Sequence, residues 1–488
     1  MIQASDGSLK QKVVHGLFWK LLELTGAQGV QFVVALLLAR LMSPREYGTI
    51  GLIMIFITIA NVFVQSGFAT ALIQAPEVRE EDYSSVFRIS ILISIPVYLL
   101  LWFGAPLVAA YYETEVLTAL LRVMGVVLFP GAVISIQSAY VARNLNFRRL
   151  FEATMFAVLL SGAVSVAMAF FHYGVWAMAA QQLVYCFGLM LGLFVAVPWR
   201  PRGGFDASRV RLLFHFGWKI LLSGLIDTIW NNAYGLIIGK RYSQADLGGY
   251  NRGEQFPKLI ASNLAAAIQS VLLPAYAKHQ GEPGMLKQMM KRSMRLSSLV
   301  IFPMMAGLAG CAEPLVRVLL TEKWLFCVPY LRVMCLCYAF WPVHVTNLQM
   351  VTALGRSDLF LKLELLKKLL GTVILVLSLR YGIVAMLLLK ALDEFLCTFL
   401  NAWPLRRLIG YGAGEQYLDM LPSAASALLM GAAVLKLSQV TESAGFALLI
   451  QIAAGVLIYV LFSLILNRES VRYLWKILRG RRGARGEG

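Results

Sequence analysis

The sequence predicts an all-α polytopic membrane protein with about 14 transmembrane helices in two pseudo-symmetric lobes around a central cavity. Over 488 residues, 59% are hydrophobic and only 14% are charged, and the mean hydropathy is +0.70. These values lie outside the range of soluble domains. Apolar runs of about 20 residues, enough to cross a bilayer, recur along the chain. Segments also echo each other about 200 residues apart, which favours two similar lobes.

The apolar runs define the predicted spans and leave no long polar insert for a soluble catalytic domain. We therefore predict no enzyme activity, no catalytic residue, no cofactor and no metal site. The six cysteines lie in apolar spans at spacings unlike those of thiolate metal sites, so we interpret them as small packing residues. The predicted spans centre near residues 28, 60, 97, 128, 162, 186, 226, 260, 305, 337, 371, 393, 429 and 456.

Lys and Arg residues gather in the loops that follow even-numbered spans, for example at Arg143, Arg200 and Lys287. By the positive-inside rule these loops are cytoplasmic, and an even number of spans then places both termini in the cytoplasm. The net charge of +18 is thus a topology signal and a match to anionic membrane lipids. It does not indicate nucleic-acid binding.

An internal repeat divides the chain. Trp19-Lys20 recurs as Trp218-Lys219, and Ser43 and Gly48 are echoed by Ser243 and Gly248 in the same order. Repeats of equal polarity imply lobes related by an axis along the membrane normal. We predict an N-terminal lobe over 1–200 (helices 1–6), a C-terminal lobe over 201–404 (helices 7–12), helices 13 and 14 over 405–466, and a basic amphipathic cytoplasmic tail over 467–488.

Several spans carry more polar residues than lipid tolerates. An isolated charge at the centre of a bilayer costs about 2.5–3.5 kcal/mol on insertion scales, so such spans need water or partners. The most polar pair comprises the spans near 226 and 260. We interpret them, with their repeat mates near 28 and 60, as walls of the central cavity. Their polar residues include Lys20, Glu23, Gln31, Asn61, Gln65, Lys219, Asp227, Asn231, Asn232, Arg252, Gln255, Lys258 and Asn263.

Six stretches give the chain a family resemblance. They are residues 38–48 (LARLMSPREYG), 65–74 (QSGFATALIQ), 248–252 (GGYNR), 273–275 (LPA), 303–308 (PMMAGL) and 312–316 (AEPLV). They resemble the bacterial O-antigen, colanic-acid and teichuronic-acid exporters, a flippase branch of the multidrug/oligosaccharidyl-lipid/polysaccharide exporter superfamily. The resemblance covers nearly the whole chain, although helices 13 and 14 carry few specific marks.

The resemblance implies a function and a location. It implies fourteen helices and the flipping of undecaprenyl-pyrophosphate-linked oligosaccharide from the cytoplasmic to the periplasmic leaflet of the bacterial inner membrane, by alternating access. The lipid-linked oligosaccharide and membrane lipids would be its partners, together with polysaccharide polymerase and glycosyltransferase proteins. Family members commonly use cations in the cavity for the anionic carrier, and the matching positions are Lys20, Arg252 and Lys258.

Each part of such a substrate calls for different side chains. Guanidinium pairs with phosphate oxygens bidentately, so Arg252 leads the predicted pyrophosphate site, which also includes Lys258, Lys20 and Lys219. Amides can bind sugar hydroxyls. Asp227 and Glu23 are candidates for a coupling proton or ion. The predicted sugar-binding and cavity-lining residues are Gln31, Asn61, Gln65, Asn231, Asn232, Gln255 and Asn263.

These assignments leave structural alternatives open. Lys20 and Lys219 could snorkel to the cytoplasmic face, and Arg252 could anchor the opposite interface. Glu254 and Lys258, spaced i,i+4, could pair only with each other. Asp227 could bond to a neighbouring helix. Further intramembrane polar residues, which we interpret as packing within the second lobe, are Arg332, His344, Lys390, Asp393 and Glu394.

Two other functions compete with the flippase hypothesis. A cation-coupled multidrug exporter of the same superfamily would share the architecture, but it would favour an acidic or apolar pocket. A membrane polysaccharide polymerase or ligase would need a large outer loop, whereas the predicted outer loops are short. Cations outnumber acids among the cavity candidates, which favours an anionic cargo.

Overall fold

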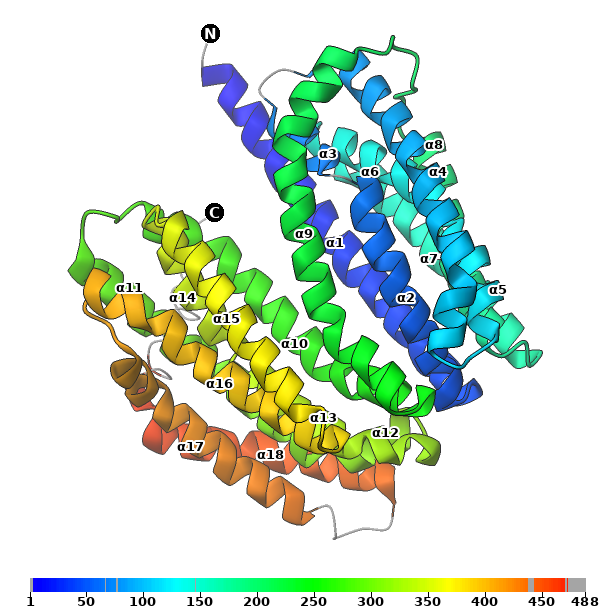
Figure 1. Cartoon of the computed structure of the whole chain (residues 1–488). Helices are drawn as coiled ribbons and strands as arrows, with labels where there is room; N and C mark the ends of the chain where they lie inside the picture. The colour runs from blue at the N-terminus through cyan, green and yellow to red at the C-terminus, as the bar shows by residue number, and fades with distance from the viewer. Residues whose placement is uncertain are drawn as a thin grey trace. The chain divides into compact units, whose positions relative to one another are not determined.

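The computed structural model describes residues 3–65, 67–75, 78–144, 146–437, 443–469 and 472, and within them it contains helices, turns and loops but no strand (Figure 1). The all-α class is thereby confirmed. The chain forms two compact units, Met1–Gly248 (unit 1) and Gly249–Gly488 (unit 2). Apart from residue 472, the predicted tail beyond residue 469 lies outside the described residues.

Unit 1 is a bundle in which α7 packs against α1 and α8, while α2 packs against α4, α6 and α9. One hydrophobic core of this unit brings Phe68, Leu72, Tyr83 and Trp199 together. The helices are α1 (Gln3–Leu41), α2 (Pro44–Gln65), α3 (Phe68–Gln74), α4 (Glu80–Tyr111), α5 (Val116–Gly125), α6 (Leu128–Arg143), α7 (Phe147–Phe170), α8 (Val175–Ala196), α9 (Ala207–Arg241) and the start of α10 (Gln244–Ala277).

Unit 2 contains the rest of α10 and all later helices. Its α11 packs against α13, α14 and α17, and its core includes Tyr276, Met290, Met350 and Tyr411. The helices are α11 (Pro283–Gly310), α12 (Ala312–Leu319), the 3-10 helix η1 (Glu322–Cys327), α13 (Val328–Ala339), α14 (Trp341–Ala353), α15 (Ser357–Ser378), α16 (Ile383–Leu408), α17 (Ala413–Leu437) and α18 (Ala444–Leu466).

Each predicted span centre lies in a helix or in a pair of consecutive helices. Among the described residues, ten helices are long and apolar enough to cross a membrane, or eleven if the bent pair Ala207–His215 and Gly217–Arg241 counts as one span. The apolar part of α1 is short (Thr25–Leu41), and α15 and α16 carry several charged residues. The chain is a multi-pass membrane protein, and the count of fourteen stays a prediction.

Arginines that the sequence marks as cytoplasmic also hold helix ends in unit 1. Arg143 donates hydrogen bonds to the carbonyl oxygens of Leu72 (3.0 Å) and Ala75 (2.6 Å). Arg209 makes a bidentate pair with Asp82 at 2.8 and 2.7 Å. The last carbonyl groups of a helix lack hydrogen-bond donors within the helix, and lipid offers none. A guanidinium that reaches these carbonyls supplies the missing hydrogen bonds.

The echoed segments form the same turn and touch each other inside unit 1. Ser43 and Glu46 exchange hydrogen bonds at the start of α2, as Ser243 and Asp246 do at the start of α10. A Cβ on Gly48 would lie 1.6 Å from the carbonyl oxygen of Gln244, and one on Gly248 would lie 2.2 Å from that of Pro44. Only glycine permits this approach of the two backbones.

The division into compact units differs from the predicted lobe boundary at residue 200/201. The boundary between units falls at Gly248/Gly249, because α9 packs against α2, α3 and α4. Tyr112 donates to the carbonyl oxygen of Leu236 at 3.3 Å, and Lys240 pairs with Glu113 at 3.0 Å. The predicted lobe boundary is based on a sequence repeat, whereas the compact units are defined by how the helices pack. The division into units therefore does not test the lobes, which stay a prediction.

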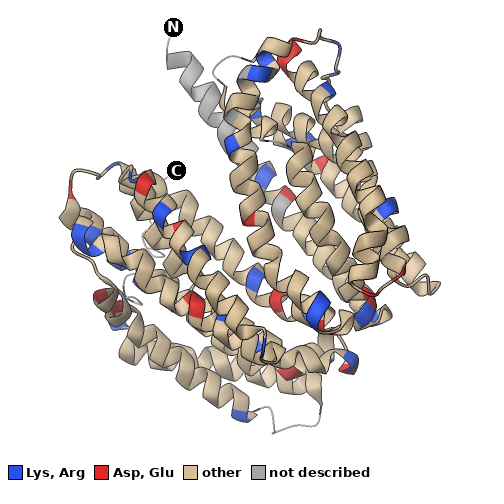
Figure 2. Cartoon of the chain, viewed as in Figure 1, with Lys and Arg blue, Asp and Glu red and all other residues tan. Residues whose placement is uncertain are grey.

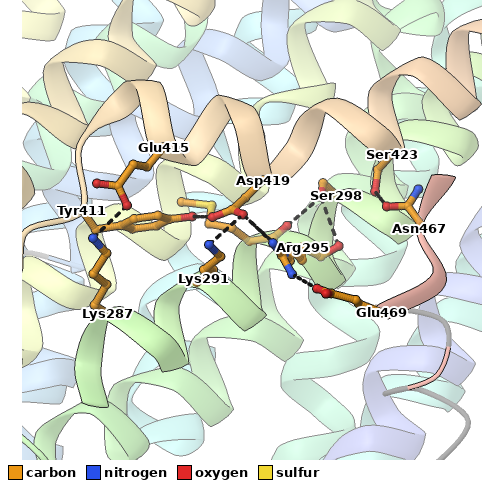
Figure 3. A network of polar contacts seen from close by, with 11 residues as sticks. Lys287, Lys291, Arg295, Ser298, Tyr411, Glu415, Asp419, Ser423, Asn467 and Glu469 are labelled. Atoms are coloured by element: carbon orange, nitrogen blue, oxygen red, sulfur yellow. Dashed lines mark hydrogen bonds and ion pairs between the residues drawn. The ribbon is translucent and has the colours of Figure 1, made fainter. Parts of the chain in front are cut away.

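In unit 2, an ionic network joins α17 and the segment after α18 to α11 (Figure 3). Asp419 on α17 is 7% exposed and accepts hydrogen bonds from Arg295 (3.0 Å) and Tyr411 (2.8 Å). Lys291 lies 3.3 Å from the same carboxylate, and Arg295 also pairs with Glu469 at 2.7 Å. Burial raises the pKa of the Tyr411 phenol, which keeps it a donor to Asp419.

The glycine contact in unit 1 predicts a local sensitivity to side-chain volume. We expect Gly48→Ala to destabilise the protein by about 1–3 kcal/mol, since the added methyl overlaps a backbone that cannot retreat. Thermal unfolding of the purified protein in detergent measures the effect. Gly104→Ala on α4, where a Cβ meets nothing within 4 Å, is the matched control and should not lower stability. Equal losses of stability in both variants would contradict a specific role for the close contact between Gly48 and Gln244.

The network on α11 makes a second prediction. Asp419→Asn should cost about 1–3 kcal/mol, because Arg295 and Lys291 lose the carboxylate that they share in a mostly buried site. Urea unfolding followed by tryptophan fluorescence measures the loss. The control is Glu469→Gln, whose side chain is 85% exposed and whose removal should leave the midpoint within error. If the two midpoints fall together, Asp419 is not the centre of the network.

Candidate functional site

The exposed face of α9 carries the most polar part of unit 1. Lys219, Ser223, Asp227 and Asn231 are all exposed along one side of this helix, whereas Tyr234, the next on the ridge, is buried. Figure 2 shows acidic and basic positions along the membrane helices as well as at their ends. Exposed groups of this polarity within a bilayer need contact with water, because lipid cannot solvate them. This polar face of α9 is the candidate site in unit 1.

The predicted residues on α1 and α2 divide into paired and exposed groups. Lys20 and Glu23 form an ion pair at 2.5 Å, so each neutralises much of the other's charge. Gln31 and Gln65 are exposed, and Asn61 is half-buried against α6, where a Cβ on Gly131 would lie 2.9 Å from its Oδ1. The roles of Lys20 in pyrophosphate binding and of Glu23 in coupling stay predictions.

In unit 2, Arg252 is 6% exposed. Its guanidinium donates to the side-chain oxygen of Gln255 and lies 5.9 Å from the centroid of the Trp324 ring. In this arrangement an amide oxygen and an aromatic face hold the guanidinium in place. Its predicted role in pyrophosphate binding stays a prediction.

The middle of α10 is more open than its start. The Lys258 side chain is 58% exposed, and Ser262, Asn263 and Gln269 are also exposed. Asn263 donates to the carbonyl oxygen of Leu259 at 2.9 Å, as Asn232 on α9 does to Thr228 at 2.7 Å. These exposed side chains on α10 form the candidate site in unit 2.

A polar cluster behind α10 links helices that the sequence left apart. Glu254 pairs with Lys258 at 3.5 Å and with Lys390 of α16 at 3.6 Å. It also accepts a hydrogen bond from Tyr338 of α13 at 2.9 Å, and Lys390 donates to the Tyr250 hydroxyl at 3.5 Å. The predicted i,i+4 pair of Glu254 and Lys258 is therefore present, but it extends to a second cation. The sequence signal for this second cation is Lys390 itself, because a lysine within an apolar span needs a partner.

Unit 2 also contains an apolar cavity of about 560 Å³ between α11, α13, α16 and α17. Phe302, Phe395 and Leu421 line it, and Arg332 is its charged lining residue. Arg332 donates to the carbonyl oxygen of Ala309 at 3.3 Å, which ties α13 to α11. This lining suits hydrocarbon and offers few partners for sugar hydroxyls.

Among the described residues, no group of three or more His, Cys, Asp or Glu side chains is arranged to hold a metal ion. All six cysteines are buried and free, as expected for packing residues. The chemistry that both units offer is that of exposed amides, hydroxyls and lysines on helices otherwise suited to lipid. Together, the fold and these faces define a multi-pass membrane protein with polar groups at bilayer depth.

Comparison with known proteins places the chain in a family. A model of the family described as "Polysaccharide biosynthesis protein" matches residues 37–329. The chain belongs to this family, which confirms the resemblance found in the sequence.

Curated relatives agree with this assignment. The chain is 25% identical to the succinoglycan biosynthesis transport protein ExoT of Rhizobium meliloti over 66% of each chain, just under two thirds. It is 24% identical to the teichuronic acid biosynthesis protein TuaB of Bacillus subtilis, over 72% of this chain and 73% of TuaB. It is 22% identical to the lipopolysaccharide biosynthesis protein WzxC of Escherichia coli, over 74% of each chain.

Solved structures share the fold. The lipid II flippase MurJ in an inward closed conformation matches with a TM-score of 0.74 and 16% identity, over 93% of this chain and all of MurJ. An inward-facing multidrug resistance transporter of the MATE family matches with a TM-score of 0.60 and 14% identity, over 78% of this chain and 94% of that chain. At these identities the likeness concerns the fold.

The polar face of α9 predicts accessibility to water. Since thiols react as thiolates, which form in water and not in lipid, we expect Asn231→Cys to be labelled by a hydrophilic maleimide in intact membranes. Ile229→Cys, on the opposite side of the helix at a site 45% exposed, should react on the order of tenfold more slowly. The native cysteines are buried, so wild type gives the background. Equal labelling rates at the two positions would exclude a wet polar face.

Proposed function

We propose that the protein flips undecaprenyl-pyrophosphate-linked oligosaccharide units from the cytoplasmic to the periplasmic leaflet of the bacterial inner membrane, for surface polysaccharide synthesis. The observation that carries this proposal is the exposed polar face of α9, with Lys219, Ser223 and Asn231, in a membrane protein of a polysaccharide biosynthesis family. The similarity to ExoT, a succinoglycan biosynthesis transport protein, and to MurJ, a lipid II flippase, supports it.

The chemistry of the two candidate faces fits an amphipathic substrate. Lys219 on α9 and Lys258 on α10 are exposed cations that can contact pyrophosphate as point charges. Asn231 and Asn263 offer amides that can replace the water bound to sugar hydroxyls. The hydrocarbon tail needs no polar partner and can stay in the lipid during transfer.

The mechanism that we propose is alternating access. The polar head group of an amphipathic substrate can cross the bilayer only if a polar path opens to one side at a time. In this proposal, exposed polar residues of both units line such a path. The distribution of Lys and Arg among the loops places both termini in the cytoplasm in this proposal. Glycosyltransferases that make the substrate and a polymerase that consumes it would act before and after this step, and the protein itself would catalyse no covalent reaction.

Surface polysaccharide in a deletion host tests the proposal. Wild type should restore the polymer, whereas Lys219→Gln and Lys258→Gln should lower it several-fold at equal membrane abundance, because each removes an exposed cation from a polar face. Lys436→Gln, at an exposed position in the last turn of α17, is the matched control and should behave as wild type.

The same strains test the earlier prediction for Arg252. Arg252→Gln should abolish export at equal abundance if this guanidinium binds pyrophosphate in some state of the cycle. If the deletion leaves every surface glycan unchanged and instead sensitises cells to cationic drugs, the flippase proposal fails and a multidrug exporter takes its place.

A further inference from the structure

A second polar cluster lies inside unit 2, around the imidazole of His344 on α14. Its Nε2 lies 3.2 Å from a carboxylate oxygen of Glu394 on α16, and the two side chains are 12% and 28% exposed. Its Nδ1 lies 2.9 Å from the side-chain nitrogen of Asn401, which is about two turns after Glu394 along α16. The imidazole is thus held between a carboxylate and an amide in a largely buried site.

The charges around this pair come from four helices. Lys367 on α15 and Lys390 on α16 interact electrostatically with Glu394, and Asp393 interacts with Glu394 and His344. Lys367 itself pairs with Glu364 at 2.5 Å, and Lys390 connects to Glu254. The titratable and charged groups of the His344 cluster are His344, Glu364, Lys367, Lys390, Asp393, Glu394 and Cys397, with Glu254, Lys258, Tyr250 and Tyr338 beyond Lys390.

The geometry of the pair favours a positive charge on the imidazole. A carboxylate inside a membrane protein is costly unless a cation lies close to it. A proton on His344 places a positive charge 3.2 Å from the Glu394 carboxylate, in a site where both side chains are largely buried.

The hydrogen bonds leave room for that proton. His344 Nε2 is at ion-pair distance from Glu394 but lacks hydrogen-bond geometry, and the buried Asn401 Oδ1 has no partner among the described residues. An amide nitrogen can only donate, so the contact as it stands suits an imidazole that accepts at Nδ1. After the amide turns over, its oxygen can accept from a protonated Nδ1, while Nε2–H donates to Glu394. Asn401 is fully buried, so its amide has few other partners.

We propose that the His344 cluster is a proton-binding site in which His344 and Glu394 take up one exchangeable proton, with Asn401 turning its amide to accommodate it. If the protein is the flippase proposed above, this proton is its coupling ion. The coupling role rests on the proposed flippase function, whereas the proton site itself does not. The sequence predicts Asp227 or Glu23 as the coupling group. This proposal assigns that role instead to the His344 cluster, in the interior of unit 2.

The site is tested by NMR of full-length protein labelled at the imidazole carbons of its five histidines. His344→Gln assigns the His344 signal by its disappearance. His279, which pairs with Glu282 at 3.3 Å on an exposed turn, is the internal reference for an accessible imidazole. Spectra from about pH 5 to about pH 8 cover the range in which imidazoles ordinarily change charge.

We expect the imidazolium form of His344 at about pH 7, and a several-fold smaller charged fraction in the isosteric variant Glu394→Gln, because the carboxylate that balances the proton is gone. The wild-type measurement needs no variant beyond the assignment, so misfolding of Glu394→Gln cannot hide the answer. A neutral His344 throughout the range, or a charged fraction that Glu394→Gln leaves unchanged, would overturn the site.

Export in the deletion host separates the site from its coupling role. Wild-type export should depend on the external pH. Glu394→Gln should lose that pH dependence, and Glu394→Asp should restore part of it. A pH dependence that survives in Glu394→Gln refutes the coupling role even if His344 binds a proton. If wild type restores no glycan at all, the flippase proposal fails, while the NMR result still decides the proton site.

Discussion

The bilayer gives an unpaired charge or backbone group no partner, and this constraint decides where every polar residue of the protein can lie. The arginines near helix ends meet carbonyl groups, as Arg143 does. Interior charges meet opposite charges, as Glu254 and Lys390 do. Other polar side chains, such as Lys219, Asn231 and Lys258, are exposed on α9 and α10, and a helix face of this polarity needs contact with water. These exposed faces define the candidate site of each unit.

Hydropathy predicted where the long helices lie, since each predicted span centre falls in a helix and a helix satisfies its own backbone in lipid. The repeat also identified Gly48 and Gly248, although only the structure shows that each meets the backbone beside the other. Prolines inside the spans predict kinks, and the structure has breaks close to two of them. One break lies at Phe340, directly before Trp341 and Pro342, and the other lies at residues 126–127, shortly before Pro130.

The candidate site was predicted less completely because charge pairs between helices depend on rotation and register, which hydropathy does not contain. Helical spacing identified the i,i+4 pair of Glu254 and Lys258, but it could not place Lys390 beside them from 132 residues further along the chain. Arg252 shows the converse. Its residue type predicts phosphate binding, and the structure adds its contacts with the Trp324 ring and Gln255, which spacing along the chain does not show.

The network on Asp419 has a consequence for shortened forms of the protein. Helices α17 and α18 lie after the predicted two-lobed core, and a chain that ended before residue 413 would still contain both lobes. It would also leave Lys287, Lys291 and Arg295 without Glu415, Asp419 and Glu469, so three cations on one ridge of α11 would lose their counter-charges at once. The last two helices and the segment after them therefore supply the counter-charges of α11, and a chain truncated before residue 413 would not be a smaller version of the same molecule.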